Sequence, residues 1–550
     1  MNGRITTIET AITQFAGTKI ISPFEKRGEI IYGRISLSEQ DVTLLFDVEI
    51  YPQYPFQFHD SETIRFINQD LLVYDHINGD GSVCVHTLHH PELSDKVTLD
   101  LNGLRHWIIK YYINRDVDSN YEHIVVNHQA INGEHRVFLF TEVDFAFKKG
   151  MHGQFKYSML REGQWKKEEY TTLLVQGFTV NRIYVPCKWS SIYQQMDMDE
   201  GVFYYHDTPP VENRRFAVKS FHQLENFFSQ EFLTYLNTYA KQIRFKGDRV
   251  SHVPLLVGYP INQHENHWQV ILIPTNEFPN YGQKITGTDT WISRLKEQPI
   301  IWTQTRNCSY SYFFGRGAFH PGITNARILV IGIGAIGSMV STTLIRGGVT
   351  DVLLVDHDIK EAENICRSEY AFLPGLTSKI TELTNRLIAI SPFAEVRGSE
   401  TLVDMFKVVI NGDDTTWLTA IKEHLDEYDI IFDCSTDNDI AFLLDRLELK
   451  GEVFSLSITN HARELICASK QNLYTWLKQI FYQLQRESED LYAPTGCWSP
   501  TFKASYNDIS VLVQFALRHI NQCFKQSTPV RHFYLSCTEE DEFTIKLKQF

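Results

Sequence analysis

Apolar and polar residues follow a β-type pattern over the first fifth of the chain. The segments GEIIYGRISLS and DVTLLFDVEIYPQYPF carry β-rich runs that end at turn residues. A glycine-rich loop follows at 79–82, and the pattern of LNGLRHWIIKYYI after it predicts a helix. We therefore expect residues 18–115 to form an α+β unit.

The pattern changes twice further along the chain. RVFLFTEVDFAF and TTLLVQGFTVNRIYVP predict more strands between residues 116 and 300, with no chemical motif among them. From Ala326 onward, the apolar strand ARILVIG, the helix AIGSMVSTTLIRGG and the strand DVLLVD follow one another. Short apolar strands that alternate with helices predict a parallel sheet with right-handed crossovers.

Length and composition narrow the class of protein. The 550 residues predict three domains, 1–115, 116–300 and 301–550, the first two α+β and the third α/β. A net charge of −15 argues against a nucleic-acid partner, which requires clustered Lys and Arg. The start of the chain has no signal-peptide pattern, and the longest apolar run, ILVIGIGAIGSMV, is too short to span a bilayer. We expect a cytoplasmic protein without a membrane partner.

The cysteines argue against structural cross-links. All nine are scattered singly and none forms a CxxC pair. A disulfide framework or a four-cysteine zinc site is therefore not expected.

A glycine motif follows the first strand of the third domain. Gly332, Gly334 and Gly337 have the GxGxxG spacing, which allows a tight turn, close approach of a phosphate, and packing of the helix on the strand. The N–H groups at the helix start would face the phosphates. Asp356 ends the second strand, where a carboxylate can bind ribose hydroxyls. These features predict a nucleotide site and fit NAD and ATP equally.

The residues after the second strand favour ATP. Asn364, Arg367 and Lys379 follow it closely, and a triphosphate needs such cations more than a dinucleotide does. Asp437 comes just after a later strand in YDIIFDCSTDND, at the sheet edge where ligands bind. A carboxylate there can hold Mg²⁺ together with nucleotide phosphates.

Five motifs in order, GIGAIGS, LLVDHD, NICR, GLTSK and DCSTDN, resemble those of the ubiquitin-activating and ThiF-like adenylation family. The resemblance covers about residues 326–470. It implies that the glycine loop and Asp356 bind ATP, that Arg367 and Lys379 contact its phosphates, and that Asp437 holds Mg²⁺. The family also has an arginine that reaches the ATP of the other subunit, for which Arg316 is a candidate here.

Two cysteines are candidate nucleophiles. Activating enzymes that form thioesters use a cysteine after the adenylation sheet, and Cys497 lies there in the Pro- and Gly-flanked segment APTGCWSPTF. Cys434 and Cys467 lie in predicted strands and are interpreted as buried packing residues.

The second candidate is Cys84, in HINGDGSVCVH. Together with Tyr54–Phe56 and the helix that follows, this segment resembles the bacterial form of the ubiquitin-conjugating fold. The His-Pro-Asn triplet of eukaryotic relatives is missing, so no oxyanion role is given to Asn78. His76 and His86 either orient the site, deprotonate an amine, or are solvated loop residues.

The whole chain resembles the conjugating–activating fusions of CBASS antiphage operons. Fusions from other bacterial ubiquitin-like pathways are close alternatives to this resemblance. The resemblance implies that a partner's C-terminus is activated as an acyl adenylate, passes to Cys497 and then to Cys84, and is joined to a target amine. The partner would be a cGAS-like nucleotidyltransferase or a ubiquitin-like protein, and the enzyme a homodimer. Two alternatives stay open: an adenylation enzyme for sulfur transfer with a non-catalytic N-terminal module, and an NAD-dependent oxidoreductase.

Overall fold

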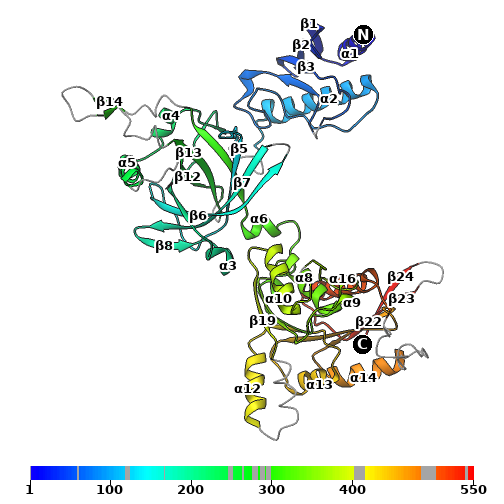
Figure 1. The fold of residues 1–550 in the computed structure, drawn as a ribbon. Coiled ribbons are helices and arrows are strands. Elements are labelled where there is room, and N and C mark those ends of the chain that lie inside the picture. The colour runs from blue at the N-terminus through cyan, green and yellow to red at the C-terminus, as the bar shows by residue number, and fades with distance from the viewer. Residues whose placement is uncertain are drawn as a thin grey trace.

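The computed structural model contains three large β-sheets that follow one another along the chain as separate bodies (Figure 1). It describes residues 2–58, 61–117, 124–165, 168–245, 252–262, 265–274, 283–284, 291–292, 299–373, 375–401, 415–484, 503–538 and 543–550. None of the helices in these ranges is long and apolar enough to cross a membrane. The predicted domain boundaries near residues 115 and 300 remain a prediction.

The first body is a four-stranded antiparallel meander packed against two helices. Its elements are α1 (Asn2–Gln14), β1 (Thr18–Arg27), β2 (Ile30–Glu39), β3 (Val42–Ile50), β4 (Ile64–Ile67), the 3₁₀ turn η1 (Gln69–Leu71), α2 (Leu93–Trp107) and the π-helical turn η2 (Ile108–Ile113). The strands predicted from residues 28–56 are confirmed as β2 and β3. The predicted helix is present but begins earlier than its apolar pattern indicated.

Buried charged residues explain why the apolar pattern of the sequence did not indicate the start of α2. Lys96 and Asp100 lie in its first turns and are each 1% exposed. The Lys96 ammonium donates to Asp100 Oδ1 (2.5 Å), Thr87 Oγ1 (2.7 Å) and Glu62 Oε2 (3.2 Å), which uses all three of its N–H groups. Asp100 also accepts from the Thr87 hydroxyl and from the Tyr54 hydroxyl (2.8 Å). This network ties α2 to the segment after Cys84.

The second body is a closed ring of strands. Its elements are β5 (Glu134–Phe140), β6 (His152–Trp165), β7 (Glu168–Val180), β8 (Ile183–Pro186), α3 (Ser191–Gln194), β9 (Asp199–Tyr205), β10 (Val211–Glu212), β11 (Phe216–Ala217), α4 (Phe221–Glu225), α5 (Gln230–Phe245), β12 (His252–Pro260), β13 (Asn266–Pro274), β14 (Gln283–Lys284), β15 (Trp291–Ile292) and β16 (Ile301–Asn307). The sheet order is β5-β16-β13-β12-β9-β6-β7-β8, and β5 also pairs with β7. Seven strands therefore form a barrel, with β8 added on its outside edge.

Alternate residues of the barrel strands enter two apolar clusters. Leu255 and Val257 of β12 pack in one cluster with Phe232 and Leu236 of α5. Leu256, between them, belongs to a second cluster that is rich in aromatic rings. This period of two is what a strand with both faces covered requires.

The third body is a three-layered α/β domain. Its elements are α6 (Tyr310–Phe314), α7 (Pro321–Thr324), β17 (Arg327–Ile331), α8 (Ala335–Arg346), β18 (Asp351–Val355), α9 (Ala362–Ile365), α10 (Lys379–Ile390), β19 (Glu395–Ser399), α12 (Thr415–Leu425), β20 (Ile430–Asp433), α13 (Asn438–Arg446), β21 (Glu452–Thr459), β22 (Glu464–Ser469), α14 (Leu473–Leu484), α16 (Tyr506–Lys525), β23 (Phe533–Thr538) and β24 (Thr544–Gln549). The strand order is β19-β18-β17-β20-β21-β22-β23-β24. The first five strands are parallel, as predicted, and the last three are antiparallel.

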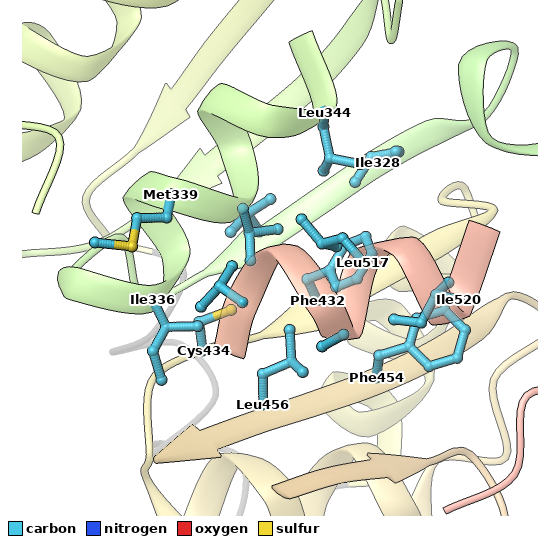
Figure 2. Packing of buried hydrophobic residues seen from close by; sticks show 14 of the residues in the cluster. Ile328, Ile336, Met339, Leu344, Phe432, Cys434, Phe454, Leu456, Leu517 and Ile520 are labelled. Carbon is cyan, nitrogen blue, oxygen red and sulfur yellow. The ribbon is translucent and has the colours of Figure 1, made fainter. Parts of the chain in front are cut away.

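Helices cover both faces of this sheet (Figure 1). On one face, α8 and α16 pack over residues such as Phe432, Phe454 and Leu456, and Figure 2 shows Leu517 and Ile520 of α16 among them. On the other face, α12, α13 and α14 cover the alternate residues of the same strands. A parallel sheet buried on both sides accounts for the nearly continuous apolar strands in the sequence.

The buried ion pair of the first body leads to a stability prediction. Asp100→Ala leaves the Lys96 ammonium buried without its main counter-charge, which costs about 3–5 kcal/mol of the free energy of unfolding. For a domain of this size that lowers the melting temperature by more than about 10 °C. Calorimetry of the full chain should show this loss in one transition. Asp95→Ala is the matched control, because Asp95 lies on the same helix with a side chain that is 60% exposed. Equal melting curves for the two variants would contradict the role of the network.

Candidate functional site

The glycine loop joins β17 to α8, as the spacing predicted. Gly332 has a φ of +75°, and a Cβ there would lie 2.5 Å from the Cα of Ser435. A Cβ at Gly337 would lie 2.0 Å from the Gly332 carbonyl oxygen. At Gly334 an added Cβ meets no described heavy atom within 4 Å. The loop is thus tightly packed at its first and third glycines and open at the second, where a ligand can approach the backbone.

Asp356 fixes the glycine loop to the end of β18. Its carboxylate accepts from the N–H of Ile333 (2.8 Å) and from the N–H of Asp358 (2.9 Å), and it is 7% exposed. The Lys379 Nζ lies 4.0 Å from Asp356 and donates to Asp358 Oδ2 at 2.8 Å. This hydrogen bond lowers the pKa of the Asp358 carboxyl. The structure therefore brings together Asp356, Lys379 and the glycine loop, and the ribose contact of Asp356 stays a prediction.

The segment with Asn364 and Arg367 folds back onto the same loop. Asn364 forms a capping box with Glu361 at the start of α9, and Arg367, which is partly buried, follows that helix. The Tyr370 hydroxyl then donates to the Ile333 carbonyl oxygen at 2.6 Å. Tyr370 was not predicted from the sequence, since its only signal is its position three residues after Arg367.

The β20–α13 turn lies on the other side of the glycine loop. Asp437 is the N-cap of α13 and accepts from the Asp439 N–H at 2.8 Å. Asp433, the last residue of β20, is buried and accepts from Ser435 Oγ (2.6 Å) and Ser455 Oγ (2.8 Å). Burial raises the pKa of the Asp433 carboxyl. The sequence analysis missed Asp433, although DCSTDN contains two aspartates of which it is the first.

In the part of the chain that the structure describes, one group of side chains has the geometry of a cation site. His, Cys, Asp and Glu side chains come together in a suitable cluster at Asp356, His357 and Asp358. The Lys379 ammonium already lies against two of these carboxylates. Asp437, the predicted Mg²⁺ ligand, is outside this cluster, and a metal there would need oxygen ligands from a bound nucleotide or water.

Cys84 lies in the first body, next to a histidine. Its Sγ is 3.3 Å from His86 Nε2, and its N–H donates to the His76 carbonyl oxygen at 2.8 Å. The His76 ring packs at a tilt against the Tyr111 ring, with the centroids 4.6 Å apart. The Asn78 amide donates to Ser82 Oγ at 2.9 Å within the turn. A ring nitrogen of His86 therefore lies within hydrogen-bond distance of the Cys84 sulfur.

The other cysteines divide by burial. Cys434 and Cys467 are buried, as predicted, and burial raises the pKa of both thiols, which disfavours a nucleophilic thiolate. Cys497 lies outside the described residues. Arg316, between α6 and α7, is exposed.

Comparison with known proteins identifies the third body. Residues 313–458 match the ThiF family. The chain is also 23% identical over 388 residues to the ATP-dependent ubiquitin transferase-like protein Cap2 of Enterobacter hormaechei subsp. hoffmannii (strain UCI 50). That alignment covers 66% of this chain and 62% of Cap2, so the chain spans less than two thirds of this relative's length. The resemblance drawn from the motifs is thereby confirmed: the chain carries a ThiF domain and is similar to a ubiquitin transferase-like protein.

Solved structures show weaker similarity. E. coli MccB with ATP is 16% identical, with a TM-score of 0.28, over 42% of this chain and 64% of MccB. PaaA is 13% identical, with a TM-score of 0.29, over 44% of this chain and 75% of PaaA.

The packing of the glycine loop gives a stability prediction. Gly337→Ala inserts a methyl group against a backbone oxygen that cannot move freely, at a cost of about 1–3 kcal/mol. Gly334→Ala points its methyl group into open space and should change the melting temperature much less. Thermal unfolding of both full-length variants checks this. The tight contact at Gly337 is refuted if the two melting temperatures fall together.

Proposed function

We propose that this protein activates the C-terminus of a partner protein with ATP and transfers it through two cysteines to a target amine. The observation that carries the proposal is the combination of two sites in one chain. A ThiF domain presents an open glycine loop, and a separate N-terminal body presents Cys84 with its sulfur 3.3 Å from His86. An oxidoreductase would need the first site alone.

The first step is adenylation of the partner. The partner's carboxylate oxygen attacks the α-phosphorus of ATP, a new P–O bond forms, and pyrophosphate leaves. Gly334 gives the phosphates access to the N–H groups at the start of α8, which have no partner within the helix. Lys379 and Arg367 offset the charge that develops on the phosphates. Asp437 would hold Mg²⁺, which supplies charge neutralisation on the phosphate oxygens when bound.

The Lys379 contacts fit this role. The Lys379 side chain is 8% exposed, and its ammonium is held between the Asp356 and Asp358 carboxylates. Asp358 is 54% exposed, so Lys379 can exchange that contact for a phosphate without leaving a carboxylate buried alone. Asp356 remains satisfied by two backbone N–H groups and can still accept from a ribose hydroxyl.

The next steps move the acyl group between sulfurs. Cys497 attacks the adenylate carbonyl, its new C–S bond replaces the bond to AMP, and AMP leaves. The product is a thioester on Cys497. The Cys84 sulfur then attacks that carbonyl, its new C–S bond replaces the bond to Cys497, and Cys497 leaves as a thiolate. A target amine finally displaces Cys84. His86 is placed to accept the Cys84 proton or to take a proton from the amine.

The first body supports the conjugating part of this proposal. Its order of helix, four-stranded meander, cysteine loop and helix supports the ubiquitin-conjugating-like domain that we propose here. The resemblance to CBASS fusions further suggests a cGAS-like nucleotidyltransferase, or else a ubiquitin-like protein, as the partner. We also propose that two ThiF domains pair as a homodimer.

A conservative change tests the adenylation site. Asp437→Asn keeps an N-cap acceptor, so the fold should be retained, but it removes the charge that would hold Mg²⁺. We expect pyrophosphate exchange to fall at least about 10²-fold. Asp439→Asn is the control, because Asp439 is exposed in the same turn and is expected to keep the wild-type rate. Wild-type exchange by Asp437→Asn would overturn the metal assignment.

Two further variants test the order of the cysteines. With ATP, Mg²⁺ and a cGAS-like nucleotidyltransferase as candidate partner, Cys497→Ala should form the adenylate but no thioester. Cys84→Ala should load Cys497 with a thioester that reductant releases. Neither should join the partner to a target. Gels with and without reductant measure each species.

The same experiment separates the competing functions. If Cys497→Ala still loads Cys84, then Cys84 attacks the adenylate directly. If Cys84→Ala still conjugates, the N-terminal body is a binding module, and a sulfur-transfer type of adenylation enzyme becomes the better explanation.

A further inference from the structure

A hairpin of the barrel domain lies against the loop that precedes Cys84. The hairpin consists of β10, β11 and the turn between them, with Arg214 and Arg215 in the turn. Arg215 is 4% exposed and donates through Nη2 to the Ile77 carbonyl oxygen, and its Nη1 lies 3.7 Å from Asp75 Oδ1. Arg214 is exposed and donates to the Val73 carbonyl oxygen at 3.3 Å.

The residues that Arg215 contacts are next to those that hold Cys84. Ile77 forms an antiparallel bridge with Val83, the neighbour of Cys84. The carbonyl oxygen of His76, beside Ile77, accepts the Cys84 N–H at 2.8 Å. A displacement of the Ile77 carbonyl would therefore be transmitted to the backbone of the cysteine itself.

The hairpin is rigid enough to fix this contact. The Arg215 N–H donates to the Glu212 carbonyl oxygen at 3.2 Å, and the two turn residues between them have φ values of 47° and 72°. This is the turn that suits tightly paired strands. The Val125 N–H donates to the Arg215 carbonyl oxygen at 2.7 Å, and the Gln223 amide donates to Glu212 Oε2 at 3.0 Å. The Arg215 side chain is thus presented from a braced backbone.

The contact between the hairpin and the cysteine loop relies on directed hydrogen bonds and not on a closely fitting apolar surface. A cavity of about 630 Å³ lies beside it, between the turn at Gly79 and Asp80 and the barrel residues Phe216 and Trp302. Directed hydrogen bonds from Arg214 and Arg215 hold the loop across this junction. A buried guanidinium that is hydrogen-bonded to a carbonyl and near a carboxylate is the strongest of them.

We propose that Arg215 is a positioning residue for Cys84, through which the barrel domain holds the cysteine loop in its reactive shape. The inference rests on the proposed function and gives the middle domain a part in it. Arg215 touches no reacting atom: it fixes the Ile77 carbonyl, and so the distance between the Cys84 sulfur and His86. Transfer to Cys84 would then depend on the docking of two domains.

Alkylation of the full-length chain with iodoacetamide tests the inference without a partner protein. Cys84, Cys366 and Cys187 are followed by peptide mass spectrometry over a range of pH. Cys366 is exposed and normalises the reagent, and Cys187 is buried in the barrel and reports that the barrel is folded. In Arg215→Ala we expect the midpoint of the Cys84 pH profile to rise by about half a pH unit, which lowers the alkylation rate at neutral pH about threefold. The reason is that the contact with His86, which favours the thiolate, is loosened. Arg215→Lys should lie between this variant and the wild type.

Arg214→Ala is the matched control, because it removes the neighbouring exposed arginine and should leave the Cys84 profile unchanged. An unchanged profile in Arg215→Ala, or equal shifts in both alanine variants, would overturn the inference. If Cys187 becomes reactive in Arg215→Ala, Asp75→Asn tests the same contact from the other domain and should raise the midpoint as well. These outcomes are independent of the proposed function, which fails instead if Cys84→Ala still conjugates.

Discussion

The carboxylate of Asp356 is the interaction on which the nucleotide end of the molecule depends. Its two oxygens hold the N–H groups of Ile333 and Asp358, so one side chain joins the glycine loop to the end of the neighbouring strand. Lys379 is oriented by the same group of acids. Together with the hydrogen bond from the Tyr370 hydroxyl to the Ile333 carbonyl oxygen, this carboxylate links the loop after β17 to the segment after β18, and both carry residues proposed to bind phosphate.

The middle domain contacts both of the other bodies. Toward the ThiF domain, the Ser190 N–H donates to the Pro392 carbonyl oxygen at 2.6 Å and Trp189 stacks on Phe393. Toward the N-terminal body, Arg215 reaches the cysteine loop. The proposed acyl transfer passes from Cys497 to Cys84, and the barrel domain contacts both the ThiF domain and the body that carries Cys84.

Sequence periodicity predicted the elements whose partners are close in the chain. The strand, glycine loop, helix and second strand around Gly332 were predicted because each follows its own apolar pattern, and the ThiF match confirms the fold of that part. The start of α2 was missed because Lys96 and Asp100 occupy buried positions that the pattern assigns to apolar residues. The contact between Cys84 and His86 was not predicted, since whether two side chains two positions apart meet depends on the local backbone, which the apolar pattern does not specify.

Closure of the barrel has a consequence for the order of events during synthesis. β5 begins at Glu134, but its partner β16 ends at Asn307, so the ring cannot close until the chain between them has emerged. Pairing across such a long sequence separation is slow compared with the local pairing of a meander. The strands of the N-terminal body each pair with the next strand in the chain, so this body can fold before the barrel closes. Until the barrel hairpin has formed, the loop that carries Cys84 therefore lacks its contact with Arg215. That loop reaches its final conformation only after the hairpin is in place.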